Sequence, residues 1–228
     1  MVDFVVNDVC VSYSPTPEST VGILDGWVST LPAELGANTG GYVSLFDDHR
    51  ATWAINQLGG VEGAGILELG PLEGGHTYML DRAGAKSITA IEANKRCYLK
   101  CLITKELLSI HSARVLLGNF VTWLEENRQK FDVIWATDVL YYMIEPLRLL
   151  RLIADRTDLL HIWTHFIQTI IGHIRFHIRL LQSRIANLRA TYSDIICAPI
   201  WASRARRPIA AASILVQHGC AARIFCGA

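Results

Sequence analysis

The sequence predicts an α/β fold in which a mostly parallel, doubly wound sheet carries helices on both faces. Short apolar runs alternate with segments of helical periodicity along the middle of the chain. The run at 131–136 is of the type found in strands that are buried on both sides. Glycines or single polar residues follow several of the runs, where a strand would end. Strands that alternate with helices in this way are typical of βαβ units and a parallel sheet.

The expected elements begin with a helix at 48–58, which Gly59 and Gly60 close. The expected strands are short and apolar, and they are 65–69, 87–91, 114–117, 131–136 and 159–164. Between them lie helices, which are expected at 77–83, 95–108, 121–126 and 146–154. Pro146 suits the first turn of the last of these helices. We expect strand 65–69 at the centre of the sheet, with its neighbours parallel to it.

The segment 66–75 is the most informative part of the chain, because it joins an apolar strand to a glycine-rich loop. It reads Ile-Leu-Glu-Leu-Gly-Pro-Leu-Glu-Gly-Gly, with Glu68 near the strand end and Gly70 and Gly74 in the loop. Such glycines let a chain turn sharply and bring its backbone close to a ligand. Glu92 ends the next expected strand, 22 residues after Gly70. In nucleotide-binding βαβ units an acid at about this distance (~20 residues) holds the ribose hydroxyls.

The glycine spacing in this loop separates two cofactors. A dinucleotide fingerprint requires a glycine where this chain has Leu72, so an NAD-dependent oxidoreductase is disfavoured. The pattern Glu-x-Gly-x-x-x-Gly resembles instead the first motif of class I S-adenosylmethionine-dependent methyltransferases. The resemblance extends over about residues 45–165. It implies a Rossmann-like fold, S-adenosyl-L-methionine as cofactor, and methyl transfer as the activity.

The resemblance also implies a cofactor site at the carboxyl ends of the strands. In that family the loop after the first strand holds the amino-acid end of the cofactor. Glu92 would bind the ribose hydroxyls with its two acceptor oxygens. Asn119 stands where the family often has an aspartate that accepts from the adenine amino group, and its amide oxygen can accept the same bond without the charge. The full set of residues implied to bind the cofactor is Glu68, Gly70, Pro71, Gly74, Glu92, Ala93, Asn119, Phe120 and Thr137.

The acceptor side of the site is expected after strand 131–136. The segment Asp-Val-Leu-Tyr-Tyr-Met-Ile-Glu-Pro, from Asp138, resembles one often written Gly-Val-Leu-Tyr-His-Met-x-x-Pro. That form is shared by enzymes that modify tRNA uridines and by many uncharacterised bacterial methyltransferases. The candidate catalytic residues are Asp138, Tyr141 and Tyr142, two of which depart from that form, and the alternative is a loop acid beside two packing tyrosines. His76 follows the glycine loop and is expected to line the same pocket.

Composition limits the classes of function. The chain has 228 residues, a net charge of zero and 51% hydrophobic residues, which suits one domain with a buried core. A net charge of zero indicates no broad basic surface, so a small-molecule acceptor is favoured while tRNA stays open. No apolar run reaches the ~18 residues of a membrane span, and the N-terminus lacks a signal-peptide pattern. The six cysteines lack metal-type spacing, so we expect no metal and a cytoplasmic protein with reduced thiols.

The chain is expected to have three parts. Residues 1–45 are rich in Pro, Gly, Ser and Thr and predict an irregular leader over the domain surface, with Trp27 and Leu31 as its anchors. Residues 46–165 form the expected methyltransferase domain. The tail, 166–228, has eight arginines, no lysine and one acid, Asp194.

Three interpretations of the tail remain open. It is a basic amphipathic helix that contacts membrane or RNA, an unusual helical cap, or an out-of-frame translation. We favour the third, because lysine, acids and most glycines disappear abruptly. On that interpretation the last strands of the sheet are missing or atypical, and no antiparallel pair is expected after residue 190. A vestigial protein that binds the cofactor without transferring a methyl group is the alternative to an enzyme.

Overall fold

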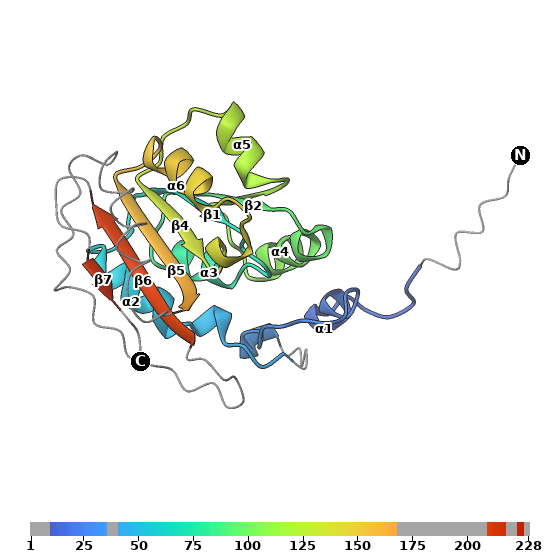
Figure 1. The fold of residues 1–228 in the computed structure, drawn as a ribbon. Coiled ribbons are helices and arrows are strands. Elements are labelled where there is room, and N and C mark those ends of the chain that lie inside the picture. Colours follow the sequence, from blue (N-terminus) through green and yellow to red (C-terminus); the bar gives the residue numbers. More distant parts are fainter. Residues whose placement is uncertain (1–9, 36–40, 168–208, 218–222, 226–228) are drawn as a thin grey trace, which may run out of the picture.

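A seven-stranded sheet organises the computed structural model (Figure 1), which describes residues 10–35, 41–167, 209–217 and 223–225. The strands are β1 (Gly65–Leu69), β2 (Ser87–Glu92), β3 (Ala113–Leu117), β4 (Val133–Thr137), β5 (Leu159–Ile167), β6 (Ile209–Gln217) and β7 (Arg223–Phe225). The α-helices are α1 (Pro17–Val21), α2 (His49–Gln57), α3 (Gly75–Arg82), α4 (Lys95–Leu107), α5 (Phe120–Glu126) and α6 (Pro146–Ala154). Three short 3-10 helices are η2 (Ala33–Leu35), η3 (Leu45–Asp47) and η4 (Leu140–Tyr142).

The strand order is β3-β2-β1-β4-β5-β6-β7, and the first five strands in this order are parallel. The predicted α/β fold class is therefore confirmed, and each predicted strand lies within a few residues of an observed one. Strand β1 is the middle one of the five parallel strands, as expected. Within it, Leu67 lies opposite Thr89 of β2 on one side and Ile134 of β4 on the other.

The expectation that the C-terminal strands are missing is wrong. Strand β6 runs antiparallel beside all of β5, from Leu159 opposite Gln217 to Ile167 opposite Ile209, and β7 pairs antiparallel with β6. The reason is local, because 209–217 reads Ile-Ala-Ala-Ala-Ser-Ile-Leu-Val-Gln, without a charge. This run pairs with an edge of β5 that would otherwise leave its backbone groups unpaired. The helix that two of the interpretations place in the tail cannot be compared with the structure, because residues 168–208 lie outside the described residues.

Alternate side chains of the strands supply two hydrophobic cores. On one face Ile66 and Trp135 pack with residues of α2, α3 and the N-terminal segment. On the other face Leu67 and Ile134 pack with residues of α5 and α6. Figure 1 shows α5 and α6 on one side of the sheet and α2 and α3 on the opposite side. This period of two between buried faces is what a parallel sheet covered by helices requires.

Side-chain caps fix where three of the helices begin. The side chain of Asp48 accepts a hydrogen bond from the backbone N–H of Arg50 at the start of α2. Asn94 caps α4 and Asn119 caps α5 in the same way. Each cap satisfies N–H groups that have no partner within the helix. Asn94 and Asn119 follow the carboxyl ends of β2 and β3, so these two helices begin at the same end of the parallel strands.

The N-terminal segment is held against the domain by buried apolar residues. Trp27 and Leu31 are each 6% exposed, so the two predicted anchors are confirmed. The Trp27 indole N–H donates to the carbonyl of Val21 at 3.1 Å. Ser29 forms an isolated parallel bridge with Val43. Within the described ranges, none of the helices has the length and apolar composition that crossing a membrane requires.

Candidate active site

The loop after β1 turns back on itself with three residues in the left-handed region. Gly70 has φ +67°, Leu72 φ +56° and Gly74 φ +83°. A side chain at Gly74 would bring its Cβ within 2.8 Å of Thr104 Oγ1, so glycine is required there by space as well as by φ. Leu72 adopts a conformation that costs a non-glycine residue about 1 kcal/mol or more, which marks the loop as a place where backbone strain is retained.

Glu92 holds this loop from the end of β2. Its Oε2 accepts from the Leu72 N–H at 3.0 Å, and its Oε1 accepts from the Asn94 N–H at 2.8 Å. The side chain is buried, with 7% of the residue exposed. Each carboxylate oxygen has more than one acceptor site, so both oxygens keep capacity for a ligand hydroxyl. Glu92 is therefore fixed in orientation before any ligand binds.

Glu68 lies beneath the same loop and is 2% exposed. Thr77 Oγ1 donates to its Oε2 at 2.6 Å. Burial raises the pKa of Glu68 to about 7, because the charged carboxylate loses its hydration and the single hydrogen bond from Thr77 only partly offsets that loss. A ligand cation beside Glu68 would favour the ionised carboxylate.

These groups face a cavity of about 380 Å³ at the carboxyl ends of β1, β2 and β4. Six of the nine predicted cofactor residues line it, namely Glu68, Gly70, Pro71, Glu92, Phe120 and Thr137. All three predicted catalytic residues line it too, together with His76: these are Asp138, Tyr141 and Tyr142. Gly74, Ala93 and Asn119 are not part of the lining. A cavity of this size, with convergent polar groups among apolar ones, is typical of a small-molecule site.

Asn119 has a different contact from the one predicted. Its Oδ1 accepts from the N–H groups of Val121 at 2.8 Å and Thr122 at 3.3 Å. These two bonds cap α5, and they compete with the expected bond to an adenine amino group. The next residue, Phe120, lines the cavity.

Asp138 begins the loop after β4 with φ +58°, the left-handed region. Its N–H donates to the Trp163 carbonyl at 2.8 Å, which ties the loop to β5. Its Oδ2 accepts from Arg50 Nη1 at 3.0 Å. Its Oδ1 is buried and has no hydrogen-bond partner among the described residues, and the same is true of Thr137 Oγ1 beside it.

Arg50 connects Asp138 to a second buried acid, Asp48. Arg50 Nε donates to both Asp48 oxygens, at 3.0 and 2.9 Å, and its Nη2 donates to Oδ2 at 2.6 Å. Burial alone raises the pKa of Asp48, but the hydrogen bonds from His76 and Arg50 outweigh it and hold that pKa well below its usual range. Asp48 is therefore ionised, and it fixes the guanidinium that reaches Asp138.

The tautomer of His76 follows from its two neighbours. Trp135 Nε1 donates to His76 Nδ1 at 3.1 Å, and His76 Nε2 lies 2.9 Å from Asp48 Oδ2. An indole nitrogen can only donate, so Nδ1 carries a lone pair and Nε2 carries the proton. His76 therefore donates to Asp48 and has no free lone pair with which to act as a general base.

Tyr141 and Tyr142 form the outer wall of the cavity. Their ring centroids lie 4.4 Å apart with an interplanar angle of 48°. Burial, together with the negative charge of Asp138, raises the pKa of Tyr141. Its hydroxyl therefore keeps its proton, which excludes Tyr141 as a general base at neutral pH.

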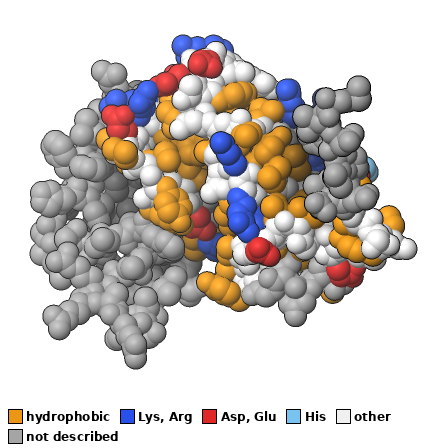
Figure 2. Space-filling view, turned by 90° about the vertical axis from the view of Figure 1, so that its right-hand side faces the viewer, with side chains coloured by type: hydrophobic (Ala, Val, Ile, Leu, Met, Phe, Trp, Pro, Cys, Tyr) orange, Lys and Arg blue, Asp and Glu red, His pale blue; other side chains and the backbone are white. Residues whose placement is uncertain are grey.

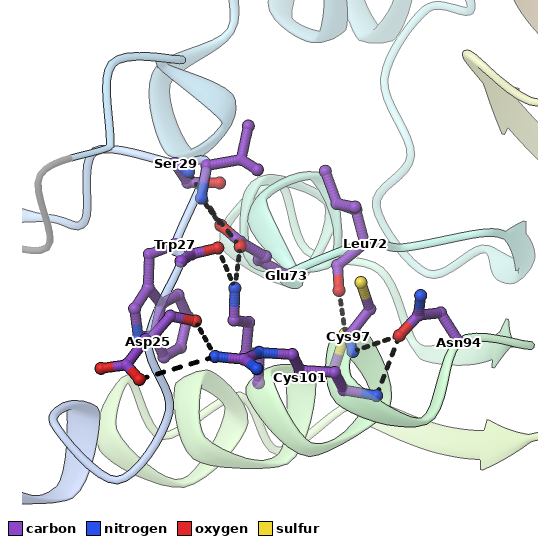
Figure 3. Close-up of polar contacts among 12 residues, drawn as sticks. Asp25, Trp27, Ser29, Leu72, Glu73, Asn94, Cys97 and Cys101 are labelled. Atoms are coloured by element: carbon purple, nitrogen blue, oxygen red, sulfur yellow. Dashed lines mark hydrogen bonds and ion pairs between the residues drawn. The ribbon is translucent and has the colours of Figure 1, made fainter.

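A further wall comes from the N-terminal segment, which was expected over the domain surface but not at the cavity. Val28 lines the cavity, and its N–H donates to both Oε atoms of Glu73, at 2.9 and 3.1 Å. The Ser29 N–H donates to Glu73 Oε2 at 2.8 Å (Figure 3). Lys100 Nζ lies 2.7 Å from Glu73 Oε1 and donates to the Gly26 carbonyl at 2.5 Å. We refer to residues 25–30, held by this buried pair, as the strap.

Metal ligands are not grouped in the part of the chain that the structure describes, where no three His, Cys, Asp or Glu side chains lie close enough to hold an ion. His161 is fully buried with its ring centroid 4.1 Å from that of Trp135. Burial lowers the pKa of His161 to about 3, so its imidazole stays neutral. It packs behind Trp135 and so supports the cavity wall.

No family model matches the chain, and no curated protein matches it. Solved structures do match. EvdMO1 aligns with a TM-score of 0.64 at 19% identity, over 88% of this chain and 46% of that one, so the chain spans about half the length of EvdMO1. The N-terminal domain of EvdMO1, crystallised in the presence of SAH and D-fucose, aligns with a TM-score of 0.63 at 17% identity, over 88% of this chain and 95% of that domain.

A third match is a putative RNA methyltransferase, PH1948 from Pyrococcus horikoshii. Its TM-score is 0.55 at 14% identity, over 88% of this chain and 96% of that one. The chain has the fold of class I methyltransferases. The resemblance found in the loop after β1 is thus matched by the arrangement of the whole sheet. At these identities the matches establish the fold, and the chemistry of this class I methyltransferase fold has to be argued from its own residues.

Proposed function

We propose that the protein is an S-adenosylmethionine-dependent methyltransferase. The observation that carries the proposal is the position of Glu92, whose two oxygens are held by the N–H groups of Leu72 and Asn94 at the rim of the cavity. A carboxylate fixed in this way suits a pair of ribose hydroxyls, which donate to it. The presence of SAH, S-adenosylhomocysteine, in crystals of the EvdMO1 domain adds support from a protein of the same fold.

Each end of the cavity suits a different part of the cofactor. Glu68, beneath the glycine loop, would face the cationic amino group of the amino-acid end. Phe120 and Val139 line the cavity beside Glu92 and would contact the apolar faces of the adenine. Gly70 and Pro71 let the loop backbone approach the ligand closely, and the cofactor supplies an activated methyl group on its sulfonium. The protein then needs to position the acceptor and exclude water.

Asp138, Tyr141 and Tyr142 form the acceptor side in this proposal, together with Thr137. Asp138 has a buried oxygen, Oδ1, without a hydrogen-bond partner among the residues that the structure describes. Tyr141 is a hydrogen-bond donor and Tyr142 a contact surface. A small-molecule acceptor is favoured, because the Lys and Arg side chains on the face seen in Figure 2 are scattered, with hydrophobic side chains between them.

Replacing Glu92 with alanine is expected to weaken SAH binding by about 10- to 100-fold. The change removes the net contribution of one hydrogen bond to a charged acceptor, about 1.5–3 kcal/mol, and every 1.4 kcal/mol is tenfold in affinity. Calorimetric titration with SAH measures it. Glu92→Gln keeps one acceptor oxygen, so its affinity for SAH should lie between those of the wild type and Glu92→Ala. Glu126→Ala, at an exposed position, should bind SAH as the wild type does.

Two outcomes would count against the proposal. A folded protein that binds no SAH is not a methyltransferase of this type, and enhanced NADH fluorescence in its place would favour the oxidoreductase that Leu72 disfavours. SAH binding without transfer to any acceptor would favour a vestigial binding protein. These results separate cofactor identity from catalytic competence.

SAH binding is expected to strengthen as the pH rises through about 7. The pKa of Glu68 is raised to about 7 from 4.5, so the free protein holds a proton there that the ligand's cationic amino group would displace. Below pH 7 affinity should fall by up to about tenfold per unit, and above it affinity should level off. The raised pKa also affects folding. The stability that protonated Glu68 contributes to the folded protein is present below about pH 4.5 and is lost as the pH rises toward 7.

Titrations with SAH on either side of pH 7 test this dependence. Glu68→Gln can still accept a hydrogen bond from Thr77 but cannot ionise. Its affinity for SAH should therefore not change with pH over the same range. A wild-type protein whose affinity does not change across pH 7, or a Glu68→Gln variant with an unchanged slope, would show that Glu68 does not face the cation.

A further inference from the structure

The acceptor end of the cavity contains buried polar atoms that have no hydrogen-bond partner within the described part of the chain. Asp138 Oδ1 and Thr137 Oγ1 are both in this state among the described residues, and both residues line the cavity. Buried polar atoms in folded proteins are nearly always hydrogen-bonded, so atoms left unpaired beside a cavity indicate a ligand. They lie at the carboxyl end of β4, where the loop turns away through the left-handed Asp138.

The unpaired oxygen of Asp138 is held in place from behind. Arg50 Nη1 binds the other oxygen at 3.0 Å, and Arg50 is itself fixed by Asp48, which also accepts from the Nε2–H of His76. Arg50 is 18% exposed in its side chain and sits over the Trp163 ring, with Cζ 5.2 Å from the ring centroid. The chain of contacts leaves Asp138 one orientation, with Oδ2 toward Arg50 and Oδ1 available to a ligand.

The donors and acceptors around this point limit what the ligand presents. Asp138 Oδ1 is a carboxylate oxygen and can only accept, so the ligand has to donate. Arg50 lines the same cavity, and its Nη nitrogens each carry a second N–H, which can donate to a ligand oxygen. A hydroxyl both donates and accepts. An ammonium cannot accept and would be repelled by Arg50 and by the sulfonium, and a carboxylate cannot donate and would be repelled by Asp138.

We propose, on the basis of the methyltransferase function proposed above, that the acceptor atom is a hydroxyl oxygen of a small neutral molecule, bound between Asp138 and Arg50. The hydroxyl oxygen forms a bond to the sulfonium methyl carbon as the carbon–sulfur bond breaks, and the electron pair of that bond goes to sulfur. The hydroxyl proton passes to Asp138 Oδ1. The products are a methyl ether, S-adenosylhomocysteine and a proton, which leaves Asp138 for solvent.

The aromatic part of the cavity lining suits the apolar side of such a molecule. Tyr141 is 39% and Tyr142 is 73% exposed, and both line the cavity. Tilted aromatic rings offer an apolar face to carbon–hydrogen surface and do not compete for the hydroxyl. Thr137 Oγ1, next to Asp138, is positioned to bind a neighbouring hydroxyl of the same acceptor, either as donor or as acceptor.

The test uses S-adenosylmethionine labelled with carbon-13 in the transferred methyl group. The protein is incubated with this probe and a small-molecule extract of the cells that produce it, and the methyl carbon of the product is observed by NMR. Its chemical shift distinguishes methyl on oxygen from methyl on nitrogen, sulfur or carbon. An O-methyl signal that requires the protein is the expected result. A product methylated on nitrogen, sulfur or carbon would overturn the inference while leaving methyl transfer intact.

Variants tie the product to the proposed atoms. Asp138→Asn should lower the rate of O-methyl formation by about 10²- to 10⁴-fold, the range for loss of a general base, with SAH affinity and thermal midpoint unchanged. Thr137→Val should raise KM for the purified acceptor more than it lowers kcat. Glu126→Gln, an exposed acid, is the matched control and should behave as the wild type.

Three other outcomes would contradict the inference, the proposed function or both. An Asp138→Asn variant that still forms the O-methyl product at the wild-type rate would contradict the role of Oδ1. Failure of the wild type to bind SAH defeats the proposed function itself. SAH binding without any labelled product contradicts both the transfer reaction and the hydroxyl acceptor.

Discussion

Replacing Leu67 with aspartate is expected to unfold the domain. Leu67 is fully buried in the central strand and packs with residues of α5 and α6. Losing its burial removes about 1.5–3 kcal/mol, and placing an unpaired carboxylate there costs several kcal/mol more. The sum approaches the whole stability of a typical domain, which is about 5–15 kcal/mol. Circular dichroism with thermal melting should show no cooperative transition, or a strongly lowered midpoint.

Two controls make the Leu67 result specific. Leu67→Met conserves volume and should cost less than about 1.5 kcal/mol. Leu117→Asp introduces the same charge at a residue of β3 that is 49% exposed, and should change stability by about 0.5 kcal/mol or less. A Leu67→Asp protein that melts like Leu117→Asp would mean that β1 is not the buried centre of the sheet.

The parallel part of the sheet could be predicted because each strand has its own local signal. An apolar run of five or six residues, a glycine or polar residue after it, and a capped helix next are all properties of neighbouring residues. Pro146 at the first turn of α6 is one example, and Gly84 after α3 is another. Such signals need no knowledge of distant parts of the chain.

The C-terminal strands were missed because a compositional signal was given more weight than a local one. The arginines and the single acid of 166–228 suggested a segment foreign to the fold. Strand β6, however, has a local signal in its own nine residues, which carry no charge, and it pairs with β5 along its whole length. The interpretation of an out-of-frame tail predicted that no antiparallel strand pair would form after residue 190. The structure therefore no longer supports that interpretation.

The acceptor side of the site contains a contact that local sequence patterns do not predict. Arg50 and Asp138 meet across 88 residues of sequence, and no periodicity connects them. One signal was present, because a positive charge in the first turn of a helix is unfavourable with the helix dipole, and Arg50 lies there. A residue in an unfavourable place often has a specific partner.

For Asn119 a local signal was present and favoured a different role from the one predicted, since an asparagine directly before a helix is a common cap.

Replacing Lys100 with methionine is expected to release the strap and destabilise the protein by about 3–5 kcal/mol, the cost of leaving one member of a buried ion pair without its partner. The Lys100 and Glu73 side chains are 3% and 1% exposed, so solvent cannot replace the lost contact. The Gly26 carbonyl would lose its donor, and Glu73 would keep only the N–H groups of Val28 and Ser29. Denaturant unfolding measures the loss.

A matched control lies on the same helix, where Lys95 is exposed at the first position of α4. Lys95→Met should leave stability within about 0.5 kcal/mol of the wild type. The double variant Glu73→Gln with Lys100→Met should lose less than the sum of the two single changes, because it no longer buries a lone charge.

The strap also connects this pair to the site, because Val28 lines the cavity. Lys100→Met should therefore expose residues 25–30 to proteolysis and weaken SAH binding, whereas Lys95→Met should do neither. Protection from proteolysis by SAH in the wild type would show that ligand and strap stabilise each other. If Lys100→Met proves as stable as Lys95→Met, with its strap equally resistant, then the apolar anchors Trp27 and Leu31 hold the segment by themselves and the buried pair contributes nothing to closing the cavity.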